Sequence, residues 1–243
     1  MGTNEPAAKP DYGFDGSPIR VPLLALGAWV AGVLLMVTSV PALKFAGVAT
    51  VVIATLFTVL AAKFVFYVRH GKLRLRDHLI SMIAWRGDET VLDIGTGRGL
   101  LMIGAAKRLT TGKSVGTDIW RQFDMAGNHI EATLKNVETE GVADKVEVKS
   151  EDARHMSFAD GLFDVILSNL CLHNIPSKQG RAEACREIVR LLKPGGIVVI
   201  SDPFYLGEYA EIFRGAGLSV KISRNRFLDT VTPWHRNLLA SKA

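Results

Sequence analysis

The sequence predicts an α/β domain with a mostly parallel sheet, preceded by a pair of membrane-spanning helices. Three observations lead to this fold class. Between Val21 and Val68 the only charged residues are two lysines. From Glu89 to Ala243, short apolar runs alternate with stretches of helical periodicity, which is typical of a parallel sheet covered by helices on both faces. A glycine-rich turn follows the first of these runs, at residues 95–99.

The composition excludes several classes of protein. The chain has 243 residues, of which 48% are hydrophobic and 22% are charged, but the apolar residues are unevenly distributed. This excludes a plain soluble domain, a disordered or collagen-like chain and a disulfide scaffold. The net charge of +5 is compatible with nucleic acid or with an anionic membrane surface. The basic residues gather directly after the apolar block, so we expect a lipid bilayer as partner and no nucleic acid.

The N-terminal part divides into a tail and an apolar block. Residues 1–20 have no apolar period and predict a flexible tail. The run from Val21 to Leu43 has no charge, and the run from Phe45 to Val68 contains only Lys63. Since a helix of about 20 residues crosses the hydrocarbon core, residues 21–68 predict a transmembrane hairpin with Pro41 at its turn. A signal peptide for the first run and a buried soluble hairpin are the alternatives, and both fit poorly with two successive runs that are apolar on all sides.

Two further expectations concern the hairpin. Lys63 lies near the end of the second run, where its long side chain is expected to reach the lipid headgroups. Small residues at Gly27, Ala31 and Ala46 are candidates for the contact between the two helices.

A basic segment follows the hairpin and predicts its orientation. Residues 69–88 are interpreted as a juxtamembrane amphipathic connector, whose basic residues are Arg69, Lys72, Arg74 and Arg76 at its start. Only Lys44 lies between the two spans, so the positive-inside rule places both termini and the following domain in the cytoplasm. Apolar residues from Leu79 to Ile83 recur at helical spacing. This helix is expected to lie either on the membrane or against the next domain.

Residues 89–243 predict alternating strands and helices. Strands are expected at 90–94, 114–118, 146–149, 163–168 and 197–201, with weaker strands near 219–223 and 237–241. Helices are expected at 100–109, 124–138, 178–192 and 208–214, the third of which should stop at Lys193-Pro194-Gly195-Gly196. The two cysteines, Cys171 and Cys185, stand outside any metal or redox spacing, so no metal site is predicted.

The turn Gly95-Thr96-Gly97-Arg98-Gly99 lies between the first strand and the first helix of this region. Glycines allow positive φ angles and a close approach of the backbone to a ligand. Dinucleotide-binding proteins also use such a turn, but Leu100 stands where their pattern has a third glycine. Asp93 stands two residues before the first glycine of the turn. A carboxylate there repels a pyrophosphate and suits a ligand that carries an ammonium and a sulfonium.

Two more acidic positions follow strands. Asp118 ends the second strand, where a carboxylate can accept hydrogen bonds from both hydroxyls of a ribose. Glu151-Asp152-Ala153 follows the third strand, where a carboxylate can accept a hydrogen bond from an adenine amine. The carboxyl ends of parallel strands form the ligand-binding edge of open α/β sheets, so we expect these acids to meet there. The alternative for each acid is a helix N-cap or a solvated loop end.

The ordered set of motifs resembles the class I S-adenosylmethionine-dependent methyltransferases over about residues 77–243. It comprises VLDIGTGRG at 91–99, VGTDIW at 115–120, EDA at 151–153, FDVILSNLCLHNI at 163–175 and LLKPGG at 191–196. The resemblance implies a Rossmann-like, seven-stranded, doubly wound sheet with an antiparallel last strand, a methyltransferase domain at residues 89–243 and S-adenosyl-L-methionine as cofactor. It also implies the cofactor-binding residues Asp93, Gly95, Thr96, Gly97, Gly99, Asp118, Ile119, Trp120, Asp152, Ala153 and Asn169, of which Ile119 or Trp120 would cover the adenine ring.

The acceptor side has a weaker signal, in the segment from Ser168 to Asn174. It lacks the Asn/Asp-Pro-Pro-aromatic pattern of amide and nucleobase N-methyltransferases, which argues against such targets. His173 is the candidate catalytic residue as a general base, with loop orientation or helix capping as the alternative role. Cys171 is interpreted as a packing residue. No pattern in the sequence predicts an oligomeric state.

These observations leave three classes of function. The first is a membrane-anchored methyltransferase that acts by in-line methyl transfer on a small lipophilic acceptor such as a lipid, quinone, isoprenoid, hydrophobic thiol or phenol. Within this class, the hairpin either presents the acceptor or only localises an enzyme for a soluble substrate. The second is a catalytically silent S-adenosylmethionine-binding scaffold or sensor. The third is an NAD-dependent oxidoreductase, which Asp93 and Leu100 disfavour.

Overall fold

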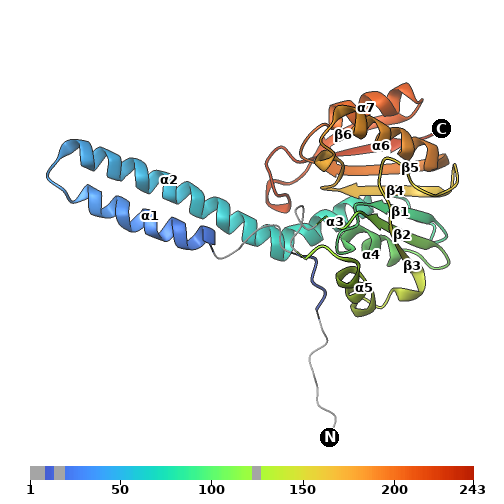
Figure 1. Ribbon diagram of the computed structural model, residues 1–243, viewed down its shortest axis with the longest axis horizontal. Helices are drawn as coiled ribbons and strands as arrows, with labels where there is room; N and C mark the ends of the chain where they lie inside the picture. Colours follow the sequence, from blue (N-terminus) through green and yellow to red (C-terminus); the bar gives the residue numbers. More distant parts are fainter. Residues whose placement is uncertain (1–8, 14–19, 122–126) are drawn as a thin grey trace, which may run out of the picture.

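The computed structural model describes residues 9–13, 20–121 and 127–243 and consists of a helical arm and an α/β domain (Figure 1). The arm contains α1 (Arg20–Met36) and α2 (Pro41–Phe66), which lie side by side and project away from the domain (Figure 1). Pro41 stands in the first turn of α2, where its missing N–H costs no helical hydrogen bond.

The domain contains one seven-stranded sheet with the strand order β3-β2-β1-β4-β5-β7-β6. Its strands are β1 (Thr90–Ile94), β2 (Lys113–Asp118), β3 (Val146–Ser150), β4 (Phe163–Asn169), β5 (Leu192–Asp202), β6 (Ser219–Arg224) and β7 (Arg236–Ser241). The pairs among β1 to β5 are parallel, whereas β7 is antiparallel to both β5 and β6. The predicted Rossmann-like α/β sheet with an antiparallel last strand is therefore confirmed.

Helices cover both faces of the sheet. They are α3 (Lys72–Ser81), α4 (Leu100–Ala106), α5 (Ile130–Thr139), α6 (Lys178–Leu191) and α7 (Leu206–Gly215). The helix expected at 124–138 begins at Ile130, and residues 122–126 of that prediction lie outside the described residues. The third predicted helix stops before Lys193 as expected, since α6 ends at Leu191. The strand expected at 197–201 begins earlier, because β5 starts at Leu192 and residues 195 and 196 exchange backbone hydrogen bonds with Lys242.

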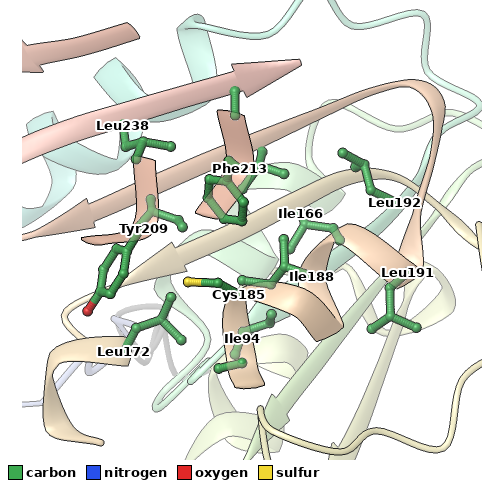
Figure 2. Packing of buried hydrophobic residues seen from close by; sticks show 14 of the residues in the cluster. Ile94, Ile166, Leu172, Cys185, Ile188, Leu191, Leu192, Tyr209, Phe213 and Leu238 are labelled. Atoms are coloured by element: carbon green, nitrogen blue, oxygen red, sulfur yellow. The ribbon is translucent and has the colours of Figure 1, made fainter. Parts of the chain in front are cut away.

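Two apolar layers hold the helices to the sheet. On one face, α6 and α7 pack on β4, β5 and β7 through residues that include Cys185, Ile188 and Phe213 (Figure 2). On the other face, α3 and α4 pack on β1 and β4, and Leu79 of α3 is fully buried there. The sequence allowed the connector helix to lie on the membrane or against the domain, and in the structure it packs against the domain.

The helix that leaves the arm enters the domain without a break. A π-helical turn, η1 (Tyr67–Gly71), joins α2 to α3, so that Pro41–Ser81 forms one helix of 41 residues. It is long and apolar enough to cross a membrane, and only 11% of its most apolar window is buried. In the described part of the chain it is the one helix that meets this criterion, since α1 has 17 residues. The structure thus supports one candidate span where the sequence predicts two.

The two helices of the arm approach each other closely at a pair of glycines. A Cβ atom added to Gly47 would lie 2.7 Å from the carbonyl oxygen of Gly32, and one added to Gly32 would lie 2.8 Å from a methyl group of Val51. The candidates Gly27, Ala31 and Ala46 do not make this contact. A Cβ atom at Gly27 would meet no atom within 4 Å, and the two alanines are exposed.

Lys63 does not reach outwards as expected but binds the domain. Its side chain is 8% exposed, and Nζ donates hydrogen bonds to the carbonyl oxygens of Thr230 (2.6 Å) and Val231 (3.1 Å). The loop between β6 and β7 supplies both carbonyls, and it also places the ring of Phe227 4.5 Å from Nζ. The lysine is therefore a tertiary contact between α2 and the far end of the chain.

The basic connector is also partly internal. Lys72 is buried, and its Nζ donates hydrogen bonds to the carbonyl oxygens of Tyr12 (3.2 Å) and Gly13 (2.8 Å). Arg76 is half-buried and pairs with Asp77. Arg69 and Arg74 remain exposed at the start of the connector.

The predicted flexible tail at residues 1–20 needs correction for its middle part. Asp11 and Asn136 exchange two hydrogen bonds of 2.8 Å, from the Asp11 N–H and from the Asn136 amide. Tyr12 is buried and its hydroxyl donates to Glu140 (2.7 Å). Residues 1–8 and 14–19 of the tail lie outside the described residues.

The glycine contact in the arm leads to a test with a matched control. Alanine in place of a helix-interior glycine raises helix propensity by about 1 kcal/mol. Gly27→Ala, in open space, should therefore keep or raise the melting temperature in detergent micelles, measured by circular dichroism. Gly47→Ala should lower it, because the added Cβ meets backbone and overpacking costs about 1–3 kcal/mol. Equal shifts for the two variants would contradict the close contact.

Candidate active site

A cavity of about 340 Å³ lies at the carboxyl ends of the parallel strands. In the sheet, β1 lies next to β4. From β1 the chain continues to β2 on one side, and from β4 it continues to β5 on the other side, so the direction of the strand order changes between β1 and β4. Open α/β sheets bind ligands at such a switch point. The glycine turn and the segments that follow β2, β3 and β4 line the cavity, together with Tyr12 from the tail, Tyr67 and Lys72 from the helix, and Val231 from the β6–β7 loop.

The glycine turn needs its glycines for two separate reasons. Gly95, Gly97 and Gly99 have φ angles of 69°, 50° and 85°, a region that side chains disfavour. A Cβ atom at Gly95 would also lie 2.2 Å from the sulfur of Cys171. The turn is therefore tightly packed on one side while Gly95, Thr96 and Gly97 line the cavity on the other.

Asp93 lies beneath the turn and holds it. Its side chain is 2% exposed, and Oδ2 accepts hydrogen bonds from the Thr96 hydroxyl (2.8 Å) and from the Met102 N–H (2.9 Å). The carboxylate thus ties the turn to the first turn of α4. Burial raises the pKa of Asp93 to about 7, although these two hydrogen bonds oppose the shift. The sequence places this acid at the rim of the strand, whereas the structure places it in the wall of the cavity, below the surface.

Asp118 joins the end of β2 to the glycine turn. Its Oδ2 accepts a hydrogen bond from the Gly97 N–H (2.9 Å), and its Oδ1 accepts from the Trp120 N–H (2.7 Å) and from the Asn128 amide (3.3 Å). The neighbouring Ile119 is exposed and lines the cavity. The carboxylate and this apolar side chain therefore stand together at one end of the site.

The sequence left two candidates for the residue that covers the adenine ring, Ile119 and Trp120, and the structure distinguishes them. Ile119 faces the cavity, but Trp120 turns towards β3, where its Nε1 donates a hydrogen bond to the Ser150 hydroxyl (2.8 Å). The backbone of Trp120 has a φ of 57°. Trp120 does not line the cavity.

Asp152 and Ala153 both line the cavity, as expected, with an additional residue beside them. The guanidinium of Arg154 donates from Nε to both carboxylate oxygens of Asp152 (3.0 and 3.1 Å) and from Nη2 to Oδ2 (2.5 Å). These hydrogen bonds lower the pKa of Asp152 and keep it ionised. Arg154 also lines the cavity, and the sequence analysis did not identify it.

Two amide oxygens in the cavity wall are buried without a partner in the described structure. They are Oδ1 of Asn128 and Oδ1 of Asn169, the last residue of β4. A buried acceptor without a hydrogen bond costs about 1–3 kcal/mol, so such a group in a cavity marks a place where a ligand donates. Together with the glycine cradle and the carboxylates, they fit a ligand with hydroxyl and amino donors.

His173 also lines the cavity and is paired with a buried acid. Its Nδ1 is 2.8 Å from Oδ1 of Asp202, the last residue of β5. Burial raises the pKa of Asp202, and the hydrogen bonds from His173 oppose that shift. With Asp202 ionised, Nδ1 carries the proton and donates it, which leaves the lone pair of Nε2 available as a base.

Cys171 packs against the glycine turn, and burial raises the pKa of its thiol well above the usual value. It is therefore a neutral packing residue, as expected. Within the ranges that the structure describes, no group of three His, Cys, Asp or Glu side chains is arranged to hold a metal ion.

Several residues of the site were missed from the sequence. Asp202 had a usable signal, since it ends a parallel strand in the same way as Asp118. Arg154 follows Asp152 by two residues, but nothing in the sequence distinguishes it from other surface arginines. Tyr12 and Val231 reach the cavity only through tertiary contacts over long sequence distances, so no local pattern could reveal them.

Comparison with known proteins gives a family match and several relatives. A family model described as a methyltransferase domain matches residues 92–200. Methyltransferase GfsG of Streptomyces halstedii is 31% identical over 139 residues, which is 57% of this chain and 46% of that protein. A demethylmenaquinone methyltransferase of Lactiplantibacillus plantarum is 31% identical over 125 residues, which is 51% of this chain and 49% of that protein. The chain thus spans about half the length of these curated relatives.

Solved structures share the fold at lower identity. A SAM-dependent methyltransferase from Aquifex aeolicus has a TM-score of 0.54 and 18% identity, with 69% of this chain and 89% of that chain covered. The [4+2]-cyclase SpnF has a TM-score of 0.56 and 18% identity, with 70% and 80% covered. Likeness at this level concerns the fold alone.

The matched segment runs from β1 to β5 and includes the glycine turn, Asp118, Asp152 and His173. The family indicates S-adenosylmethionine as the cofactor, in place of the nicotinamide cofactor that the sequence analysis kept as an alternative. The glycine cradle, the carboxylates and the unpartnered amide oxygens fit that cofactor. Residues 92–200 therefore form a methyltransferase domain, and this part of the chain is similar to S-adenosylmethionine-dependent methyltransferases.

Proposed function

We propose that this protein is a membrane-anchored methyltransferase that transfers a methyl group in line to a small lipophilic acceptor. One observation carries the proposal. A single cavity joins the glycine turn to His173 and, at the same time, is lined by Tyr67 and Lys72 of the helix that continues from the apolar arm.

On the cofactor side, Asp93 and the turn from Gly95 to Gly99 hold the methionine part of S-adenosylmethionine, with Asn169 beside it. Asp118 accepts hydrogen bonds from the ribose hydroxyls. The adenine lies against Ile119 and Ala153, with Asp152 as the acceptor for its amine. When bound, this cofactor supplies a methyl group that the positive sulfur already activates.

On the acceptor side, the protein has to align the acceptor and exclude water. Nε2 of His173 accepts the proton of an acidic acceptor group such as a phenol, and Asp202 keeps the imidazole in the required tautomer. The His173–Asp202 distance of 2.8 Å supports this role over simple helix capping, because the cap of α6 is supplied by Ser177. The silent-scaffold alternative is not favoured, since both sides of the cavity are intact.

The membrane assignment is supported by the arm. α2 has the length and composition of a span, and we propose that α1 crosses the membrane beside it. Arg69 and Arg74 are exposed where the helix leaves the apolar region, which favours a cytoplasmic domain and cytoplasmic termini by the positive-inside rule. The alternative, in which the arm only localises the enzyme, does not explain why residues of the same helix line the cavity.

The names of relatives point to more than one acceptor class. Several matched relatives are named demethylmenaquinone methyltransferase, and another is named ubiquinone/menaquinone biosynthesis C-methyltransferase UbiE. One is named 27-O-demethylrifamycin SV methyltransferase. A quinone-like or phenolic lipophilic acceptor is consistent with the first group and with the proposed base.

The buried carboxyl of Asp93 leads to a test of cofactor binding. Its pKa in the free protein is raised to about 7, and a cationic ligand favours its ionised form. Binding near neutral pH should therefore release a proton, and affinity should rise between about pH 6 and about pH 8 and then level off. Calorimetry with S-adenosylmethionine in two buffers of different ionisation enthalpy measures both effects. Asp93→Asn should weaken binding and remove the pH dependence, whereas the exposed control Asp88→Asn should keep it.

The base is tested by substitution. His173→Gln should lower the rate of S-adenosylhomocysteine formation with membrane extract by about 10²–10⁴-fold, because a general base of this kind contributes that much. Affinity for S-adenosylmethionine should stay unchanged. The exposed control His78→Gln should have the wild-type rate. Full activity of His173→Gln would remove the base from the mechanism.

The acceptor class is tested with the full chain. Protein reconstituted in lipid vesicles is supplied with S-adenosylmethionine labelled in the methyl group and with total cell extract. We expect the label in organic-extractable products that mass spectrometry can identify, and none with Asp118→Ala. Label confined to water-soluble products would be consistent with a methyltransferase but would contradict a lipophilic acceptor.

A further inference from the structure

The loop between β6 and β7 exposes large apolar side chains. Phe227, Leu228 and Trp234 are 52%, 48% and 55% exposed. Single exposed apolar residues are common on protein surfaces, but three in one short loop that also contains a tryptophan are typical of an interaction surface. We name residues 224–236 the β6–β7 loop segment.

This segment is fastened by three contacts to the continuous helix Pro41–Ser81, at residues of α2, η1 and α3. Lys63 binds the carbonyl oxygens of Thr230 and Val231. The backbone of Leu228 and Asp229 passes so close to Gly71 that a Cβ atom there would lie 2.8 Å from the Leu228 carbonyl oxygen. Arg74 lies 3.9 Å from Asp229. Figure 1 shows the segment reaching from the sheet towards the helix.

These contacts determine where the β6–β7 loop segment lies along the helix axis of α2. Leu60 is the last large apolar residue of α2 that is exposed, and Lys63 follows it by three residues. At 1.5 Å per residue, the two differ by about 5 Å along the helix axis. If α2 spans the bilayer as proposed above, the segment lies at the level of the lipid headgroups, where tryptophan is enriched.

The charges of the segment favour anionic lipid as the partner. Arg224 and Arg236 are directly opposite each other in the antiparallel pair of β6 and β7, and both are exposed. Like charges in such a position repel. Arg226 is also exposed, and none of these three arginines makes an ion pair with an acid in the described part of the chain. Phosphate groups placed against them would relieve the repulsion and supply the missing partner.

We propose that the β6–β7 loop segment is a second membrane-contact surface, in which Phe227, Leu228 and Trp234 enter the headgroup region and Arg224, Arg226 and Arg236 bind anionic phospholipids. This inference rests on the proposed insertion of α2. It also deepens the proposed function, because Val231 of the same segment lines the cavity. The contact holds that wall of the cavity at the surface of the bilayer, so that a lipophilic acceptor enters without crossing bulk water.

The test measures the depth of Trp234 in the full-chain protein. The protein is reconstituted in phosphatidylcholine vesicles with and without phosphatidylglycerol, with brominated acyl chains as the fluorescence quencher. Subtracting the spectra of Trp234→Phe and of Trp29→Phe from the wild type isolates one reporter in the loop segment and one in the arm. Since an interfacial tryptophan is close to the acyl chains, the Trp234 signal should fall by about twofold in anionic vesicles.

Charge variants separate lipid binding from simple proximity. Arg224→Glu with Arg236→Glu should abolish most of the Trp234 quenching, while Arg108→Glu, an exposed arginine at the end of α4, should leave it unchanged. Equal quenching without phosphatidylglycerol would overturn the role of the arginines.

The remaining outcomes distinguish this inference from the proposed function. Quenching of Trp29 without quenching of Trp234 would overturn the second membrane contact while keeping the membrane anchor. Absence of quenching at both tryptophans would overturn the membrane anchor as well. Calorimetry with S-adenosylmethionine on the same samples reports the cofactor site separately, so that its failure is not confused with failure of the lipid contact.

Discussion

The buried carboxylate of Asp93 is the interaction on which the cavity depends. One oxygen of this side chain holds both the Thr96 hydroxyl and the Met102 N–H, and so joins β1, the glycine turn and α4. It thereby supports a turn in which three glycines have positive φ and Gly95 packs against the sulfur of Cys171. Because the same carboxyl is removed from water, its pKa is raised to about 7. Structural support and a carboxyl that titrates near neutral pH are thus combined in one side chain.

The second determining feature is the continuous helix from the arm into the domain. Its apolar part has few protein contacts, whereas its last turns are buried against the sheet through Leu75 and Leu79. Between them, Tyr67 and Lys72 line the cavity and Lys72 holds the backbone of Tyr12. A displacement of the arm relative to the sheet would therefore change the cavity itself. This coupling gives a physical reason for attaching a long apolar helix to this fold at this position.

Much of the domain could be predicted because its signals are local. Short apolar runs that alternate with stretches of helical periodicity predicted the position of every strand of the sheet, and the glycine spacing predicted the turn at residues 95–99. Errors arose where tertiary contacts override local preference. Lys193–Gly196 stops the helix as predicted, but the strand expected to begin at Ile197 already begins at Leu192, because the backbone at residues 195 and 196 pairs with Lys242. Lys63 looks like a headgroup anchor, but two carbonyl oxygens from the other end of the chain compete successfully for its ammonium.

The sequence by itself determined the fold class, the cofactor family and the carboxylates at the strand ends, since each depends on residue type at fixed spacing along one or two elements. Tertiary structure alone decided that Ile119 and not Trp120 faces the cavity, and that Asp202 supports His173. It also decided that Tyr12 of the tail and Val231 of the β6–β7 loop segment line the cavity. Contacts between residues more than one hundred positions apart have no local signature, because only the folded chain brings them together.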